Sequence, residues 1–341
     1  MQIPYISIII LHYKNLSDTR ECLKSLQKLD YERFNVILVN NDSLEHKDSL
    51  EREFNDFVKI IQNEKNLGFA EGNNVGIQVA LEDQQTDAVL LLNNDTVVEP
   101  NFLSEMLKIK ADMISPQMID YNDHNKIDNL GIVLMTSGLP FNRTNENQKL
   151  FCPSGGCALY TRKLLEDVAT PSRHSEFVSE STSSKNKILN QVQDDVCYFD
   201  PTYFAYCEDL DLGWRARNKG FEAGYSTKAI VYHKGSSIHG KLSDFAIYHT
   251  YRNLLWTQFK NMPFELLLWQ CPWFFAGCIF IFFYYILKAK SILIIKTILH
   301  GLIGIISRFN SRSKNLKNKT ASNKKILSLL ETGLFPKNLI K

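Results

Sequence analysis

The sequence predicts an α/β fold in which a mostly parallel sheet is covered by helices on both faces. Continuous apolar runs of strand length alternate with amphipathic segments over the first 110 residues. Such runs are typical of parallel strands that are buried on both faces. The expected strands lie at residues 5–11, 34–40, 57–63 and 88–93.

Helices are expected between and after these strands. In residues 17–29, Cys22, Leu23, Leu26 and Leu29 recur at helical spacing, and Asp18 and Glu21 fit a capping box at the start. Two further helices are predicted, from about Asn73 to Leu81 and directly after Pro100, which suits a first helical turn.

The bulk composition excludes several classes of protein. The 341 residues hold 39 Lys and Arg against 37 Asp and Glu, so the charge gives no reason to expect a nucleic-acid partner. The seven cysteines show no regular spacing, which favours reduced thiols over a disulfide framework or a zinc site. The first 15 residues lack the basic start and cleavage site of a signal peptide.

Apolar residues are concentrated late in the chain. Residues 266–287 carry no formal charge over 22 residues, with two Trp near one end and two Tyr near the other. This length suffices to cross a membrane, and the aromatic residues suit its interfaces. A buried core helix is the alternative. Residues 291–307 are also apolar, so the pair forms either a single span with a following segment, or a hairpin or interfacial pair.

The composition also predicts where domains begin and end. A first domain is expected over residues 1–260, interrupted by a serine-rich insertion at about 170–197. Residues 261–307 form the apolar, membrane-associated part. Residues 308–341 form a basic tail, either disordered or in contact with anionic lipid.

Four short stretches carry groups suited to ligand chemistry. VNNDS (39–43) and LLNNDT (91–96) follow strands, and a carboxylate beyond a strand end can hold Mg²⁺ or Mn²⁺. NLGFAEGNNVG (66–76) offers glycines for close backbone approach to a ligand, without matching GxGxxG or the Walker pattern. YCEDLDLGWR (206–215) crowds three carboxylates, which suits either a helix start or a general base.

In order, the stretches SIIILHYKN, VNNDS, NLGFAEGNN, LLLNNDT, PSGGCALYTRKLLEDV, FDPTYFAYCEDLDLGWR and VYHKGSS resemble the family-2 glycosyltransferases. Within that family the chain is most similar to the bacterial rhamnosyltransferase-like branch, over about residues 4–260. The resemblance implies a GT-A (Rossmann-like) fold, a nucleotide-diphosphate sugar donor, Mg²⁺ or Mn²⁺, and inversion at the anomeric carbon.

The resemblance also implies roles for individual residues. The metal would be held by Asp95 and His233, and the catalytic base would be Asp209, with Glu208 as second choice. The remaining assignments are contacts to the nucleotide-sugar, at Asn40, Asp42, Ser43, Asn66, Gly68, Asn73, Asn74, Asn93 and Asn94, and acceptor-side contacts, at Gly155, Gly156, Trp214 and Arg215. Asn40 stands where many relatives place an Asp that contacts the base.

The expected function is transfer of a sugar, with rhamnose suggested by the resemblance, to a hydroxyl of a lipid-linked or cell-surface glycan. The enzyme would lie at the cytoplasmic face of the inner (cell) membrane, attached through its C-terminal apolar segment. A sugar nucleotidyltransferase is one alternative, although it does not account for CEDLDLGWR followed by VYHKGSS. A catalytically silent, membrane-attached sugar-binding protein is the other.

Overall fold

The computed structural model describes residues 3–171, 196–235, 243–288 and 290–336. Within these residues nine strands form the central sheet, in the order β3-β2-β1-β4-β10-β6-β13-β5, with β7 paired to β6. Their bounds are β1 Tyr5–His12, β2 Phe34–Asn40, β3 Val58–Gln62, β4 Thr86–Asn93, β5 Thr96–Val98, β6 Met113–Asp120, β7 Ile127–Asn129, β10 Cys157–Thr161 and β13 Ala223–His233.

Most of the sheet is parallel, as predicted. β1 pairs in parallel with both β2 and β4, β2 with β3, and β6 with β13. β10 runs antiparallel between β4 and β6, and β5 runs antiparallel to β13. Because the strand order reverses beside β1, the carboxyl ends of β1 and β4 border the crevice where such folds bind ligands.

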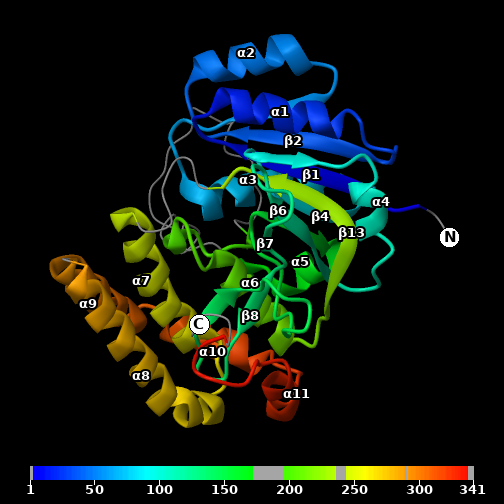
Figure 1. The fold of residues 1–341 in the computed structure, drawn as a ribbon. Helices are drawn as coiled ribbons and strands as arrows, with labels where there is room; N and C mark the ends of the chain where they lie inside the picture. The colour runs from blue at the N-terminus through cyan, green and yellow to red at the C-terminus, as the bar shows by residue number, and fades with distance from the viewer. Residues whose placement is uncertain (1–2, 172–195, 236–242, 289, 337–341) are drawn as a thin grey trace, which may run out of the picture.

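Two hydrophobic cores lie on opposite faces of the sheet. Successive strand residues point to opposite faces, so Ile9 and Leu91 belong to one core while Ile8 and Leu90 belong to the other. The first core is covered by α3 (Gly68–Glu82), α5 (Arg162–Val168) and α6 (Glu208–Asn218). The second is covered by α1 (Leu16–Leu26), α2 (Leu44–Phe54) and α4 (Phe102–Met106), as Figure 1 shows.

The start of α1 differs from the predicted capping box. Its N-cap is Asn15, in the left-handed region at φ 41°, and no side chain caps the helix. Asp18 and Glu21 instead form ion pairs with Lys234, at 2.7 and 2.5 Å. The two acidic residues that were expected to cap the helix therefore pair with Lys234, which is distant in the sequence.

The glycine-rich stretch lies mostly inside α3, which begins at Gly68 rather than near residue 73. A Cβ at Gly72 would lie 2.5 Å from Leu11 Cδ1, and one at Gly76 would lie 2.5 Å from Ile9 Cγ2. These two glycines let α3 approach the sheet, so they serve packing rather than close approach to a ligand.

Two small sheets and a short helix complete the catalytic region. β8 (Ile132–Leu134) and β9 (Pro140–Asn142) form a hairpin. β11 (Thr170–Pro171) pairs with β12 (Val196–Cys197), so both ends of the serine-rich stretch meet, while residues 172–195 lie outside the described part of the chain. A 3-10 helix, η1 (Pro201–Tyr203), follows.

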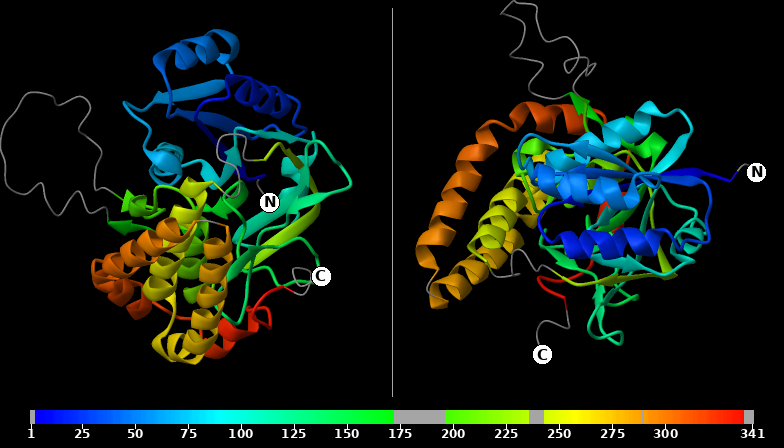
Figure 2. Two further views of the ribbon diagram at one scale, coloured as in Figure 1. Left: turned by 60° about the vertical axis from the view of Figure 1, so that its left-hand side comes forward. Right: turned by 90° about the horizontal axis from the view of Figure 1, so that it is seen from above.

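The C-terminal helices gather at one end of the molecule, far from α2 (Figures 1 and 2). Their bounds are α7 Asp244–Asn261, α8 Phe264–Leu287, α9 Ser291–Ile306, α10 Phe309–Lys317 and α11 Asn323–Ser328. By length and composition, α8 qualifies as a membrane-crossing helix within the described residues, and α9 with α10 does so only as a pair bent by 62°.

Candidate active site

Two neighbouring cavities open at the carboxyl edge of the sheet. The larger has a volume of about 530 Å³ and the smaller about 200 Å³. Both are lined by Asn93, at the end of β4, and by Asp95, two residues further on. This arrangement places one carboxylate at the boundary between two binding spaces.

Glycines bring the chain before β10 close to these groups. Asn93 N donates to Gly156 O at 2.9 Å. A Cβ at Gly155 would lie 3.2 Å from the Phe69 ring and 3.5 Å from Asp209 Oδ2. The predicted acceptor-side residues Gly155 and Gly156 therefore line the larger cavity, beside Asp209.

Two carboxylates and one imidazole lie close together in the larger cavity, those of Asp95, Asp128 and His233. His233 Nε2 lies 3.5 Å from Asp95 Oδ1, and its Nδ1 lies 2.7 Å from Asp128 Oδ2. Asp95 Oδ1 is buried and has no hydrogen-bond partner among the described residues. Burial alone would lower the pKa of His233, but the hydrogen bond to Asp128 and the Asp95 carboxylate raise it to about 9.

Glu208 and Asp209 begin α6 and line the larger cavity. Burial raises the pKa of Glu208 well above its usual value, and the neighbouring Asp209 charge raises it further. Burial also raises the pKa of Asp209, but its carboxylate accepts from Gly155 N at 2.8 Å and from Leu210 N at 2.7 Å. Those donors favour the charged form of Asp209 and oppose the effect of burial, whereas the Asp209 charge adds to the effect of burial at Glu208.

The loop before α6 has an unusual backbone. Phe204, Tyr206 and Cys207 all have positive φ, at 65°, 70° and 66°, although none is glycine. Tyr206 and Cys207 line the larger cavity, and Phe204 and Tyr206 line the smaller one. Non-glycine residues in this region require support from the surrounding structure.

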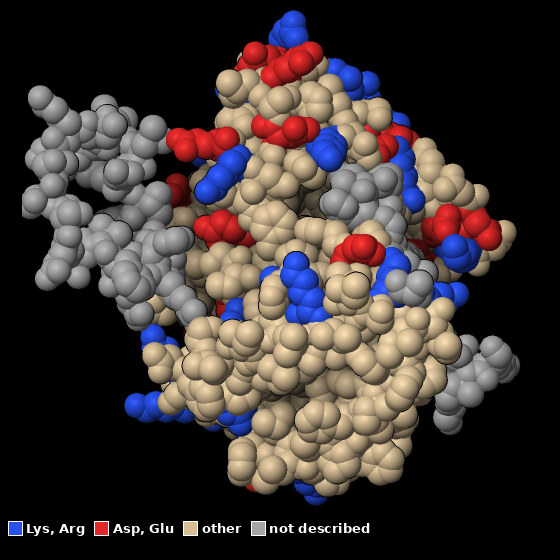
Figure 3. Space-filling view, turned by 90° about the vertical axis from the view of Figure 1, so that its left-hand side faces the viewer, with Lys and Arg blue, Asp and Glu red and all other residues tan. Residues whose placement is uncertain are grey.

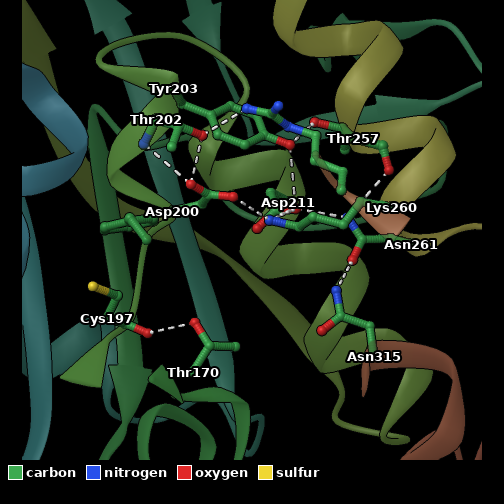
Figure 4. A network of polar contacts seen from close by, with 12 residues as sticks. Thr170, Cys197, Asp200, Thr202, Tyr203, Asp211, Thr257, Lys260, Asn261 and Asn315 are labelled. Atoms are coloured by element: carbon green, nitrogen blue, oxygen red, sulfur yellow. Dashed lines mark hydrogen bonds and ion pairs between the residues drawn. The ribbon is translucent and has the colours of Figure 1, made fainter. Parts of the chain in front are cut away.

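A buried polar network supplies that support (Figure 4). Lys260 Nζ on α7 lies 2.9 Å from Asp200 before η1 and 2.9 Å from Asp211 on α6. Asp211 also pairs with Arg215 Nε at 3.1 Å and accepts from Asn261 Nδ2 at 2.7 Å. The network joins α6, α7 and the chain before η1, so it holds the loop 204–207 from both ends.

The smaller cavity takes part of the predicted nucleotide-sugar set. Of the residues named from the sequence, those that line it are Asn66, Gly68, Asn93 and Asn94, together with Asp95. Gly68 has φ +79°, and a Cβ there would lie 2.6 Å from Phe204 O. Glycine is thus needed at the position where α3 begins beside the cavity.

Five residues of that set do not line either cavity. Asn40 is fully buried, and its amide donates to Ser43 O at 2.9 Å and Gln62 Oε1 at 2.7 Å. Asn74 is likewise occupied by the backbone of Tyr198 and Phe199. The others also make internal bonds, with Asn73 donating to Phe69 O, Ser43 capping α2 and Asp42 accepting from Lys14 N. Their positions argue for structural roles.

The prediction that Trp214 and Arg215 contact the acceptor is wrong for this structure. Trp214 is fully buried, with its ring centroid 5.0 Å from that of Phe151. Arg215 is also buried and binds Asp211, Val168 O and Tyr198 O. Both side chains stabilise the core behind α6 rather than the cavity.

Some cavity residues were not predicted from the sequence. Asp128 lies in the β7 segment and reaches His233 because β7 pairs with β6, which neighbours β13. Asn41, rather than Asn40, lines the smaller cavity and donates to Gly68 O at 3.0 Å. Phe245, on α7, lines both cavities. The position of Asn41 one residue after the strand end is a local signal that indicates it.

Comparison with known proteins agrees with this architecture. A family model described as "Glycosyl transferase family 2" matches residues 7–169. The low-salt glycan biosynthesis hexosyltransferase Agl10 of Haloferax volcanii is 22% identical over 253 residues, which is 73% of this chain and 73% of that relative. The putative glycosyltransferase EpsH of Bacillus subtilis is 25% identical over 115 residues, 33% of this chain and 32% of that relative.

Among solved structures, GalNAc-T7 with UDP, GalNAc and Mn²⁺ matches with a TM-score of 0.56 at 13% identity, over 80% of this chain and 50% of that chain. At this identity the likeness shows the fold, which is the GT-A-like α/β sheet described above. The family model, which covers just under half of the chain, and the hexosyltransferase relative together identify this chain as a glycosyltransferase that resembles family 2 over residues 7–169.

Proposed function

We propose that this glycosyltransferase moves a sugar, with inversion, from a nucleotide-diphosphate sugar to a hydroxyl of a lipid-linked or cell-surface glycan. The single observation that carries the proposal is the pair of cavities that meet at Asn93 and Asp95. The smaller suits the nucleotide, since backbone and amide groups line it. The larger, with Asp209, suits the acceptor and the transferred sugar.

The residues at the boundary fit a divalent ion, Mg²⁺ or Mn²⁺. Asp95 Oδ1 is a buried carboxylate oxygen without a hydrogen-bond partner among the described residues, and His233 Nε2 lies 3.5 Å from it. Asp128 is placed to orient His233 by accepting from Nδ1, an arrangement common behind metal-bound histidines. When bound, such an ion stabilises the charge that develops on a leaving diphosphate.

Asp209 is proposed as the general base. An acceptor hydroxyl has a pKa far above neutrality, so a positioned carboxylate must take its proton during the attack. The donors Gly155 N and Leu210 N hold the Asp209 carboxylate in place at the cavity wall. We expect Asp209→Asn to lower turnover by about 10² to 10⁴-fold, because the amide preserves shape and cannot accept the proton.

The cellular setting is proposed from the C-terminal helices. The apolar helix α8 and its neighbour α9 would attach the enzyme to the cytoplasmic face of the cell membrane, beside a lipid-linked acceptor. The relative Agl10 is named for glycan biosynthesis, which is consistent with a glycan acceptor. Rhamnose stays a proposal that rests on the sequence resemblance.

A panel of nucleotide-sugars tests the reaction class and the donor together. Hydrolysis or transfer is measured for dTDP-rhamnose and for UDP-linked hexoses and N-acetylhexosamines, with Mn²⁺, with Mg²⁺ and with chelator. The proposal predicts release of a nucleoside diphosphate from at least one donor, only with metal. Release of pyrophosphate from sugar phosphate and nucleoside triphosphate would indicate a nucleotidyltransferase instead. If a nucleotide-sugar binds but is not turned over, even when metal and an extract that contains acceptors are both present, the protein would be a silent sugar-binding protein.

A further inference from the structure

The exposed faces of α8 and α9 form one apolar surface, termed here the apolar plate. Trp273 is 57% exposed and Ile303 is 66% exposed, although both are large hydrophobic residues. Figure 3 shows this face as a broad area with few charged side chains, bordered by Lys and Arg. The plate consists of Phe264, Leu268, Trp269, Trp273, Phe275, Ile279, Phe280, Phe283, Ile286, Leu287, Ile292, Ile295, Leu299, Leu302, Ile303 and Ile306.

The opposite face of α8 rests on the catalytic region along most of the helix. Leu266, Gln270, Gly277 and Tyr285 are buried, at spacings that put them on one side of a helix. A Cβ at Gly277, near the middle of α8, would lie 2.6 Å from Leu139 Cδ1, between β8 and β9. The hydroxyl of Tyr285, near the end, lies 3.4 Å from that of Tyr251 on α7.

α9 is attached to α7 just as closely. Gly301 and Gly304 lie against Leu255 and Trp256, where a Cβ would clash. Trp256 Nε1 donates to Gly301 O at 2.9 Å, which fixes the rotation of α9. Consequently both helices turn one side to the protein and the other side outward.

These contacts argue against α8 crossing a bilayer on its own, although its length and composition would allow a crossing. A crossing helix would carry its whole apolar length through about 30 Å of hydrocarbon. The packed side of α8 would take α7 and the β8–β9 hairpin with it. α7 carries Arg252 and Lys260, whose charges are costly at that depth. A helix with one apolar exposed face and one packed face instead suits the plane of the interface.

The charges around the plate indicate which surface covers it. Between residues 266 and 330 the sequence has no Asp or Glu. Basic residues near an apolar face attract anionic lipid head groups. The same stretch carries ten basic residues, Lys288, Lys290, Lys296, Arg308, Arg312, Lys314, Lys317, Lys319, Lys324 and Lys325. Of these, Arg308 is buried, and Lys290 and Lys325 pair with Asp244 and Glu222.

We propose that the apolar plate lies in the plane of an anionic lipid bilayer, inserted into one leaflet, and does not cross it. The inference deepens the proposed function and rests on it, because it places the acceptor cavity relative to the lipid. Among the described residues, α7 and the β8–β9 hairpin both line the larger cavity and contact the helices of the plate. Phe245, Ala246 and Thr250 of α7 and Phe141 of β9 line that cavity. Further along α7, Leu255 and Trp256 contact α9, and Leu139, just before β9, contacts α8.

Depth measurement along α8 tests the orientation. Nitroxide labels are placed at Leu268→Cys, Phe275→Cys and Phe283→Cys, on the exposed face, in a chain with Cys271→Ala and Cys278→Ala. The first and last positions are about 22 Å apart along the helix. With phosphatidylglycerol–phosphatidylethanolamine vesicles, collision with oxygen and with a water-soluble relaxer should give depths equal within about 5 Å. A middle label about 10 Å deeper than both others, or no depth for any label, would overturn the proposal.

Vesicle co-sedimentation tests the surface itself. Trp273→Glu with Ile303→Glu, one change on each helix, should weaken binding at least about tenfold. Leu44→Glu, at an equally exposed leucine on α2, is the matched control and should bind like the wild type. Unchanged binding of the double variant would contradict the proposal.

Metal-dependent donor hydrolysis, measured without lipid, should be the same in all three proteins. If hydrolysis is absent throughout while equal depths are found, the proposed function fails and the in-plane orientation stands.

Discussion

At the scale of single residues, burial raises the pKa of both Glu208 and Asp209, but their hydrogen-bonding surroundings differ. Glu208 Oε2 is buried and has no hydrogen-bond partner among the described residues, whereas Asp209 accepts from two backbone N–H groups. The two donors work against the rise in the pKa of Asp209, and nothing comparable does so at Glu208 Oε2. Under the proposed function, this difference would favour Asp209 as the base.

The raised pKa of Glu208 predicts how stability depends on pH. Above the usual Glu value of 4.5, the folded protein keeps a proton on Glu208 that the unfolded chain releases. Stability contributed by this group is therefore present at low pH and falls as pH rises through that window, by at most about 1.4 kcal/mol per pH unit.

Glu208→Gln removes this titration, so its stability relative to wild type should increase from pH 5 to pH 8. Urea unfolding at several pH values measures the difference. Glu146→Gln, at a solvent-exposed loop residue, is the control and should show no trend. A constant difference between Glu208→Gln and wild type would contradict the assignment of a proton to Glu208.

At the scale of elements, the network around Lys260 predicts a large effect from one substitution. Lys260→Met leaves the buried carboxylate of Asp200 without its cation, although Arg215 still pairs with Asp211. We expect a loss of about 3 kcal/mol, the low end for breaking a buried ion pair. Turnover should also fall, because the loop 204–207 loses its support.

Urea unfolding and donor turnover together check this prediction. Lys163→Met removes a solvent-exposed pair with Asp167 on α5 and should change neither quantity noticeably. If Lys260→Met were as stable and as active as the control, the network would not position the loop.

The paired strands β11 and β12 make a prediction for the serine-rich insertion. Since Pro171 and Val196 already face each other, residues 172–195 can be replaced by a two-residue Asn-Gly turn without moving the sheet. We expect the melting temperature and transfer rate to stay close to those of the full chain, with the rate within about threefold. A large gain in transfer would show instead that the insertion restricts the acceptor site.

The elements also show what could and could not be predicted from the sequence. Strand ends are local signals, and Asn93 and Asp95, named from such a signal, both line the two cavities, while their roles stay predictions. Trp214 and Arg215 were misassigned because residues five and six positions after Asp209 turn about 140° and 240° around a helix, away from the cavity. Asn40 lies outside both cavities while Asn41 lines the smaller one, because a shift of one residue at a strand end reverses the direction of the side chain.

Contacts between segments that are distant in the chain could not be predicted from the sequence. Asp128 reaches His233 across 105 residues, and no pattern near Asp128 marks it. The family resemblance likewise names no such partner. Only the pairing of β7 with β6 and of β6 with β13 brings the two together.

At the scale of the whole molecule, the structure is layered. The sheet comes first, the two cavities lie at its edge, and the C-terminal helices follow. The smaller cavity lies at the carboxyl ends of β1 and β4, and the larger cavity is lined by residues of the sheet, of α6 and of α7. α8 and α9 cover the outside of α7 and the β8–β9 hairpin. Under the proposed function, this order would bring an acceptor held at a lipid surface towards the proposed base, Asp209.

The central claim is that Asp95 holds the metal and nucleotide while Asp209 removes the proton, and one calorimetric comparison tests it. Binding of UDP and dTDP, each with Mn²⁺, is measured for wild type, Asp95→Asn and Asp209→Asn, alongside turnover of the active donor. We predict that wild type binds at least one diphosphate only with metal. Asp209→Asn should bind it equally and turn over at least about 10²-fold more slowly, and Asp95→Asn should lose metal-dependent binding. Undiminished binding by Asp95→Asn, or normal turnover by folded Asp209→Asn, would contradict the account.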